Sequence, residues 1–204
     1  MRSRYPIVLA FCLLMGCTSY QVVRIPVRDA GLYPVSQTLD AISVGIDPIK
    51  DGRRSARYFG IDLLDQGILP VVITVSNHGR SRAAVNPGNI LLRRGNSVVD
   101  PLPIEHIISK ATVWRMSEET ATQINQYLRN LAFQDRVLMA GDTYQGVLFF
   151  PVRQESDTAA NGFTVLDVFS GNLMKLTVVV TDLGESKRYR FGPFSVEQPY
   201  FWPG

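Results

Sequence analysis

The sequence predicts a mainly β fold: an antiparallel β-sandwich with a short helix between its first strands and an inserted helical hairpin. Short stretches rich in β-branched residues recur along the chain, and several of them alternate apolar and polar side chains. Turns rich in Gly, Asn, Asp and Ser separate these stretches at short intervals. Strands joined in this way indicate antiparallel pairing, because parallel βαβ units need a longer crossover.

The first 16 residues have the composition of a secretory signal peptide. Arg2 and Arg4 give the start of the chain a positive charge with no acid, and the apolar run PIVLAFCLLM follows. This run has about half of the roughly 20 apolar residues that a transmembrane helix needs. Small and polar residues come directly after it, so we expect export of the chain and removal of residues 1–16.

The end of the apolar run, Leu14-Met15-Gly16-Cys17, resembles the lipobox of bacterial lipoproteins. In such proteins the nucleophilic thiol is alkylated by a diacylglycerol donor, the peptidase cuts before it, and the new amine is acylated, with palmitate as a typical chain. Two or three acyl chains on Cys17 give stable anchoring. Thr18 stands where an Asp resembles the inner-membrane retention signal of enteric bacteria, which favours the outer membrane. The alternative is an ordinary signal peptide or a buried core cysteine.

Removal of residues 1–16 changes the net charge and the number of cysteines expected in the mature chain. The 21 basic residues become 19 against 18 acidic ones, and the formal net charge falls from +3 to +1. We therefore expect no nucleic acid as a partner. Cys12 leaves with the signal peptide, so a disulfide within one mature chain is excluded. About 190 residues remain, which can bury the core of one sizeable domain.

Residues 17–38 are predicted to be a lipidated tether, because Pro26 and Pro34 interrupt them and no period is sustained. Part of the tether is expected to lie against the domain as an irregular edge strand through Val22, Val23, Ile25 and Val27. The domain itself is predicted to cover residues 39–204. Its first strand, residues 39–47, has apolar side chains at even positions and stops at Asp47-Pro48.

Between the first two strands, residues 55–66 place Ala56, Phe59, Leu63 and Leu64 at helical spacing. This pattern predicts a short helix that crosses from one sheet to the other. The neighbouring basic residues have two readings, a solvated helix face or a site for phosphate or lipid headgroups, and acids close by favour the first. They are Lys50, Arg53, Arg54 and Arg57.

The clearest strand covers residues 67–77, since it is β-branched and ends in the turn signal Asn77-His78-Gly79. Residues 89–93 and 97–99 are predicted to form a hairpin across Arg94-Gly95-Asn96. The remaining predicted strands are residues 136–139, 143–151, 163–169, 173–182 and 187–196.

Residues 103–131 depart from the strand pattern and predict a helical hairpin inserted into the sandwich. Apolar side chains at Ile104, Ile107, Ile108 and Ala111 share one helical face, and Ser117 is a candidate N-cap for a second helix. The second apolar stripe consists of Ala121, Ile124, Leu128 and Leu131. The hairpin is expected either to cap an open end of the sandwich or to carry a binding function.

Three segments together resemble the immunoglobulin-like sandwich domains of unknown function found in bacterial surface lipoproteins. They are GILPVVITVSNHGRSRAAVNPGNILLRRGN, LMAGDTYQGVLFFPV and MKLTVVVTD. In those domains a strand ends in Asn, a later Gly-Asp precedes a strand of the form G-x-L-x-F, and a hairpin closes the sheet. Asn77, Gly141-Asp142 and residues 146–150 occupy these places, and the likeness covers roughly residues 40–196. The resemblance implies a fold and brings no catalytic residues.

The sequence offers little support for catalysis, and we expect no enzyme, no cofactor and no metal. His78 and His106 each lack a second ligand at metal spacing. Glu118 and Glu119 are neighbours at a helix start, where they complement the helix dipole and do not face one another across a cleft. A hydrolytic function requires one of the histidines to lie within hydrogen-bond reach of a serine and an acid.

The chain ends in three adjacent aromatic residues between prolines, Tyr200, Phe201 and Trp202. These rings, with Trp114 of the helical insertion, are candidate contacts for a protein partner, although the tail could instead fold back on its own sandwich. The sequence therefore predicts a non-enzymatic envelope lipoprotein, a membrane-anchored binding or scaffold module with a protein partner. The alternative is a carrier or sensor of a small apolar ligand, held between the helical insertion and the sandwich in a cavity bounded by Ile107, Trp114 and Ile124.

Overall fold

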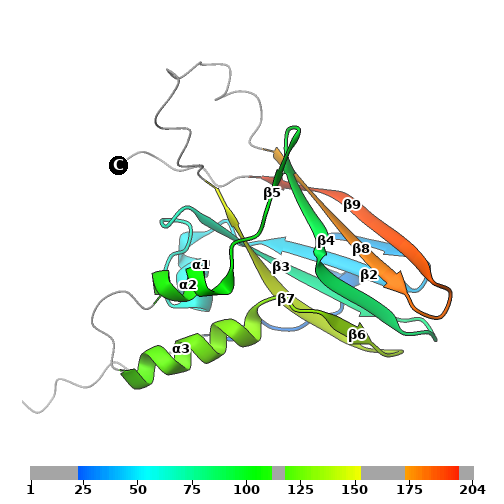
Figure 1. The fold of residues 1–204 in the computed structure, drawn as a ribbon, viewed down its shortest axis with the longest axis horizontal. Helices are drawn as coiled ribbons and strands as arrows, with labels where there is room; N and C mark the ends of the chain where they lie inside the picture. The colour runs from blue at the N-terminus through cyan, green and yellow to red at the C-terminus, as the bar shows by residue number, and fades with distance from the viewer. Residues whose placement is uncertain (1–22, 112–117, 153–172, 198–204) are drawn as a thin grey trace, which may run out of the picture.

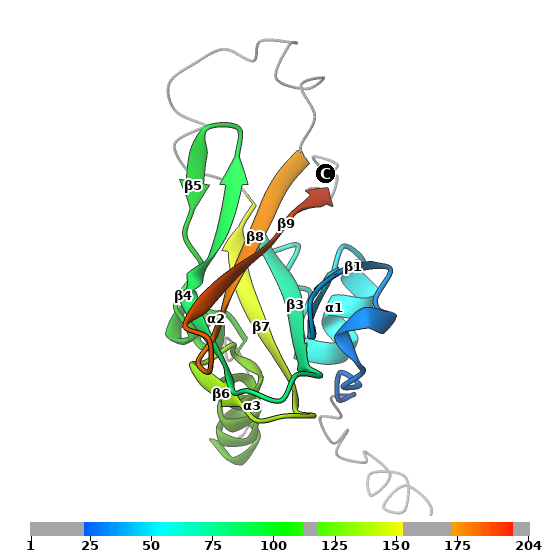
Figure 2. The same ribbon diagram turned by 90° about the vertical axis from the view of Figure 1, so that its right-hand side faces the viewer.

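The computed structural model describes residues 23–111, 118–152 and 173–197. These residues form two antiparallel sheets, packed face to face, with three α-helices gathered on one side (Figures 1 and 2). Several predicted features lie outside the described residues. They are the signal peptide, Cys17, Trp114, Ser117, the strand at 163–169 and the aromatic tail.

The first sheet has the strand order β1-β2-β3-β7, with β1 at Val35–Leu39, β2 at Ile42–Pro48, β3 at Ile68–Asn77 and β7 at Thr143–Pro151. The second has the order β5-β4-β8-β9, with β5 at Ser97–Val99, β4 at Ala83–Arg94, β8 at Leu173–Asp182 and β9 at Lys187–Glu197. The short strand β6, Arg136–Leu138, pairs with the start of β4. Two antiparallel sheets packed face to face, with the helices beside them, confirm the predicted mainly β sandwich.

The main core lies between the two sheets, where alternate side chains of each strand point inward. Val71, Ile73 and Val75 of β3 face Val178 and Val180 of β8 in this layer, and all five are fully buried. Pro70 sits inside β3, which is unusual for a central strand. It is accommodated because β2 has ended there, and the carbonyl of Pro70 accepts a hydrogen bond from the Ile49 N–H at 2.9 Å.

A second apolar layer covers the outer face of the first sheet, which explains why every residue of β3 is buried. The helices of this layer are α1 (Gly52–Phe59), α2 (Ile104–Ala111) and α3 (Glu118–Leu131). Ile107 of α2 and Ile124 of α3 pack with Val72 and Val147 of the sheet. Helices α2 and α3 of the predicted hairpin are therefore present (Figure 1). Their buried apolar residues pack against a face of the first sheet rather than an open end of the sandwich.

Helix α1 differs from its prediction in position and in role. It begins after the N-cap Asp51 and ends at Gly60, which has a φ of 77°, so Leu63 and Leu64 lie in the following turn. Because α1 connects β2 and β3, which are neighbours in one sheet, the prediction that it crosses between sheets was wrong.

The folded part begins earlier than residue 39, so the described part of the predicted tether belongs to the sandwich. Ile25 and Ala30 are buried, a 3-10 turn (η2) covers Ala30–Leu32, and the edge strand is β1 at 35–39 rather than a strand through Val23 and Val27. The backbone of Ala30 can approach β2 because Gly45 has no side chain: a Cβ there would lie 2.4 Å from the Ala30 carbonyl oxygen.

Asn77, at the end of β3, connects three turns. Its side-chain amide donates hydrogen bonds to the carbonyls of Ser81 at 2.8 Å, Met139 at 3.1 Å and Leu138 at 3.3 Å, and its carbonyl accepts from the Gly79 N–H at 3.0 Å. Its backbone binds the turn at Gly141-Asp142 through bonds of 2.7 and 2.9 Å. Asn77 and Gly141-Asp142, two of the features that resemble those sandwich domains, are therefore hydrogen-bonded to each other. Together they connect the turns at this end of the sandwich.

Candidate functional site

The helical insertion leaves and rejoins the sandwich at the outer edge of β7. Before α2, the Leu102 N–H donates to the Phe149 carbonyl at 2.7 Å. After α3, the Phe133 N–H donates to the Val147 carbonyl at 2.9 Å, and Ala132 forms an isolated parallel bridge with Val147. Strand β7 is an edge strand of its sheet, so these contacts satisfy carbonyls that would otherwise be open to a strand from another chain.

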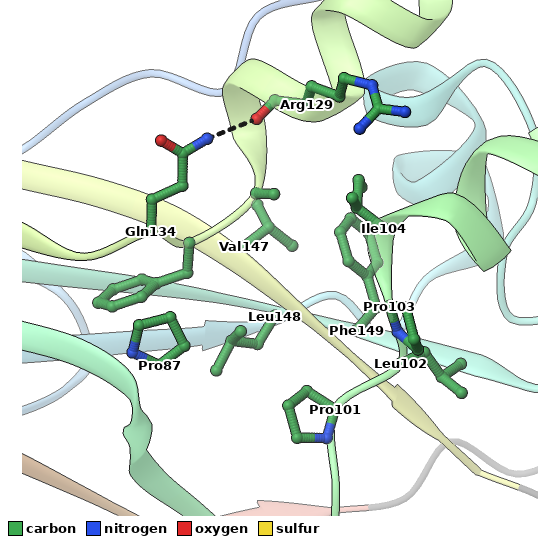
Figure 3. Close-up of a pocket in the computed structure, with 12 residues that line it drawn as sticks. Pro87, Pro101, Leu102, Pro103, Ile104, Arg129, Gln134, Val147, Leu148 and Phe149 are labelled. Carbon is green, nitrogen blue, oxygen red and sulfur yellow. Dashed lines mark hydrogen bonds between the residues drawn. The ribbon is translucent and has the colours of Figure 1, made fainter.

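A groove of about 460 Å³ lies at this base of the insertion, between the helices and the sandwich (Figure 3). The volume falls within the range of small-molecule sites. Its wall is mostly apolar and includes three prolines: Pro87 inside β4, and Pro101 and Pro103 in the segment that leads into α2. The lining residues are Pro87, Pro101, Leu102, Pro103, Ile104, Arg129, Ala132, Phe133, Gln134, Val147, Leu148 and Phe149.

Gly146 positions one wall of the groove. The Phe133 backbone passes so close to β7 that a Cβ at position 146 would lie 2.6 Å from the Phe133 Cα. The Phe133 ring packs against the Tyr144 ring at a centroid distance of 5.1 Å. The Tyr144 hydroxyl accepts a hydrogen bond from the Gln134 N–H at 2.7 Å, and burial raises the pKa of this phenol.

Two polar side chains stand among the lining residues. Arg129 Nη1 donates to Glu105 Oε1 at 2.9 Å, and the Gln134 side-chain amide donates to the Arg129 carbonyl at 3.1 Å, as drawn in Figure 3. A hydrogen bond from its own backbone N–H and the guanidinium of Arg129 hold the pKa of Glu105 below its usual value. Arg129 is therefore the ionisable residue of the lining, and no carboxylate is part of it.

The backbone of Phe149 adds a donor to the floor of the groove. In an antiparallel ladder both polar groups of one residue point to the same side. The carbonyl of Phe149 points to the outer edge, toward Leu102, so its N–H points there too. Within the described residues this N–H has no hydrogen-bond partner, although Phe149 is buried. Buried amides without a partner are rare in folded proteins.

A second groove, of about 530 Å³, lies where β9 ends beside β2, and charged side chains are part of its lining. Four of its charged side chains form two pairs: Arg54 binds Asp47 through both terminal guanidinium nitrogens, and Lys50 lies 2.7 Å from Glu197. The fifth, Asp51, accepts a hydrogen bond from the Arg54 N–H at 2.7 Å. The hydrogen bonds to Asp47 raise the pKa of Arg54. The hydrogen bond from Lys50 lowers the pKa of Glu197. This groove thus has no unpaired donor comparable to the Phe149 amide, and the apolar groove is the stronger candidate.

The structure brings together different residues from those predicted. Ile107 and Ile124 are packed in the outer core and are not among the residues that line the groove, which lies at the base of the hairpin. Cys17, Trp114, Tyr200, Phe201 and Trp202 lie outside the described residues. The sequence reasoning missed Arg129 and Phe149. The Pro101-Leu102-Pro103 run was the available signal, since it marks a backbone break at the start of the insertion.

The two histidines lie apart from the groove lining. His78 Nε2 lies 3.1 Å from Asp29 Oδ2 at the surface, and His106 is exposed on α2. In the part of the chain that the structure describes, no hydrogen bond connects either imidazole to a serine hydroxyl. The same residues contain no cluster of three or more potential metal ligands. Nor does a described helix have the length and hydropathy to cross a membrane.

No protein-family model and no curated protein matches this chain. Among the solved structures that align with this chain are three of low similarity. YcdA of Bacillus subtilis, a candidate lipoprotein, aligns with a TM-score of 0.42 and 14% identity over 80% of this chain and 38% of its own. YjhA of Bacillus subtilis aligns with a TM-score of 0.38 and 14% identity over 78% and 95% of the two chains. A FixG-related protein of Vibrio parahaemolyticus gives 0.35 and 9% over 74% and 92%.

This chain spans well under two thirds of the YcdA structure. Likenesses as low as these carry no information on activity, ligand or partner, because immunoglobulin-like sandwiches serve many functions.

Proposed function

We propose that this chain is a bacterial envelope lipoprotein, anchored by acyl chains on Cys17, and that its sandwich is a non-enzymatic binding module. The outer membrane is the favoured location because Thr18 follows the lipidated residue. The apolar groove between the helical insertion and the sandwich is the observation that supports binding. An envelope protein that contacts the helical insertion or the aromatic tail is the proposed partner.

The start of the fold supports a short anchor. The Val23 N–H donates to the Arg57 carbonyl at the end of α1 at 3.1 Å, and Ile25 is buried. Five residues, 18–22, separate Cys17 from Val23. The six Cα–Cα steps between them reach at most about 21 Å when fully extended. A lipidated Cys17 would therefore hold the α1 side of the sandwich close to the bilayer. A long flexible arm is not required.

Metabolic labelling with a palmitate analogue tests the anchor. We expect label, recovery in the outer-membrane fraction and a mature mass that begins at Cys17. All three are lost in Cys17→Ala. Cys12→Ala is the matched control, because Cys12 belongs to the predicted signal peptide and its thiol is not modified. A soluble, unlabelled wild-type product would contradict the proposal.

The groove also favours a second function, the carriage or sensing of a small apolar ligand. Its lining is chiefly prolines and branched or aromatic side chains, and its volume suits a small molecule. A photoreactive alkyl probe that labels the groove in the mature protein would support this function. Labelling confined to the remainder of the surface would favour the binding of a protein.

A further inference from the structure

We infer that the groove binds an amphipathic small molecule, an aliphatic chain with a carboxylate head, whose oxygen accepts a hydrogen bond from the Phe149 backbone. This inference rests on the proposed binding function of the groove, and it is independent of the lipid anchor. Three features of the lining lead to it. They are the Phe149 N–H without a partner among the described residues, the short stretch of the β7 edge that the insertion leaves uncovered, and the positive charge of Arg129.

The open amide requires an acceptor. The Phe149 N–H points to the outer edge of β7, Phe149 is one of the residues that line the groove, and this N–H has no partner among the described residues. Without a ligand it is therefore a buried donor that is not satisfied. An oxygen atom of a ligand would satisfy it. A pure hydrocarbon would fill the groove and leave the amide unpaired, which costs about 1–3 kcal/mol.

The gap in the edge excludes a long peptide strand. A strand that adds to a sheet edge needs several consecutive donors and acceptors. On β7 the carbonyls of Val147 and Phe149 are already bound, by Phe133 and Leu102, and Pro151 has no N–H. Between the two ends of the insertion one N–H remains, so the groove matches a ligand with one acceptor group better than an extended peptide.

The charge of the lining favours an anion. Arg129 is the ionisable residue among the lining side chains, and no acid faces it from within the groove. Glu105 lies outside the lining and binds one guanidinium nitrogen, Nη1, which leaves the other nitrogens able to bind a second carboxylate. A carboxylate head is complementary to this cation and to the amide, whereas an ammonium head would meet two donors.

Photocrosslinking of the full chain in native membranes tests the inference. The probe is decanoate with a diazirine near its tail, compared with the matching decanol and decyltrimethylammonium probes. Mass spectrometry then locates the label. We expect decanoate to label the peptides around Leu102 and Phe133 at least fivefold more than the alcohol, and the cationic probe to give the weakest labelling.

Three variants test whether the photolabel results from binding in the groove. Ala132→Trp fills it and should remove labelling, while Ala56→Trp, the same change on the exposed face of α1, should leave labelling unchanged. Arg129→Gln removes an exposed ion pair, which contributes little to stability, and should abolish the preference for decanoate over decanol. Equal labelling by the three probes, or labelling that persists in Ala132→Trp, would overturn the inference.

The palmitate label on Cys17 is measured in the same membranes. Anchored protein that takes no decanoate would refute the inference about the groove and leave the anchor intact. Groove labelling in a protein without the palmitate label would refute the anchor alone.

Discussion

Replacement of Asn77 by alanine should destabilise this protein more than any loop substitution of the same kind. The side chain is 2% exposed and binds the turn at Ser81 and the turn at residues 138–139 at once. Alanine removes the donors to three carbonyls and the acceptor for the Gly79 N–H. The bond to the Leu138 carbonyl is buried and the other three are part-buried, so these backbone groups have only partial access to water.

The expected loss follows from the number of bonds. An amide supplies two N–H donors and one acceptor here, and each hydrogen bond contributes about 1 kcal/mol net. Backbone groups that stay buried without a partner add to this loss, so we expect a decrease of about 3–4 kcal/mol in the free energy of unfolding. Asn77→Asp should be as severe, since a carboxylate would place an acceptor against three carbonyl oxygens.

Urea unfolding of the wild type and the variants measures this quantity from the midpoint and the slope. Asn96→Ala is the matched control, because Asn96 is exposed in the β4–β5 turn, and its loss should be under about 0.5 kcal/mol. A loss below about 1 kcal/mol for Asn77→Ala would show that these turns are held by other contacts and would refute this reasoning.

Three further predictions concern the groove and the caps. Gly146→Ala should displace Phe133, cost about 1–3 kcal/mol in unfolding free energy and lower the crosslinking of decanoate, as urea titration and mass spectrometry would measure. Gly60→Ala should cost about 1–2 kcal/mol, because φ is positive at the end of α1, and an unchanged urea midpoint would contradict this. The pKa of Glu105 is lowered first by the hydrogen bond from its own backbone N–H and then by Arg129, so these two contacts of the carboxylate stabilise the fold above the usual value of 4.5 and are lost as the pH falls through the folded pKa. Thermal melts of Glu105→Gln should therefore differ from the wild type at pH 7 and coincide with it at pH 3.

The elements that the sequence predicted well have a strong local pattern. Strands β3, β7 and β8 are β-branched or alternating, and the structure gives them nearly the predicted bounds. Helices α2 and α3 carry apolar residues at helical spacing, which predicts them without knowledge of their neighbours. The lipobox is read from the order of a few residues, and it remains a prediction.

Strand β1 and the burial of Ala30 were missed because their signal is not local. Residues 35–39 are mostly polar and mostly exposed, as an edge strand permits, so they have no apolar period. The close approach of Ala30 to β2 depends on the absent side chain of Gly45, a residue 15 positions later. The helix α1 was found, but its role as a connection within one sheet depends on which strands pair.

The sequence by itself determined the class of fold, the place of the helical insertion and the expectation of a lipid anchor, because periodicity and short motifs encode these locally. Tertiary structure alone decided the candidate site. The groove is assembled from residues 87 to 149, and its most informative group is the backbone N–H of Phe149, which every residue except proline possesses. That amide is distinctive solely because β7 lies at the edge of its sheet and the insertion leaves one stretch of this edge uncovered. The type of residue at position 149 does not predict this arrangement.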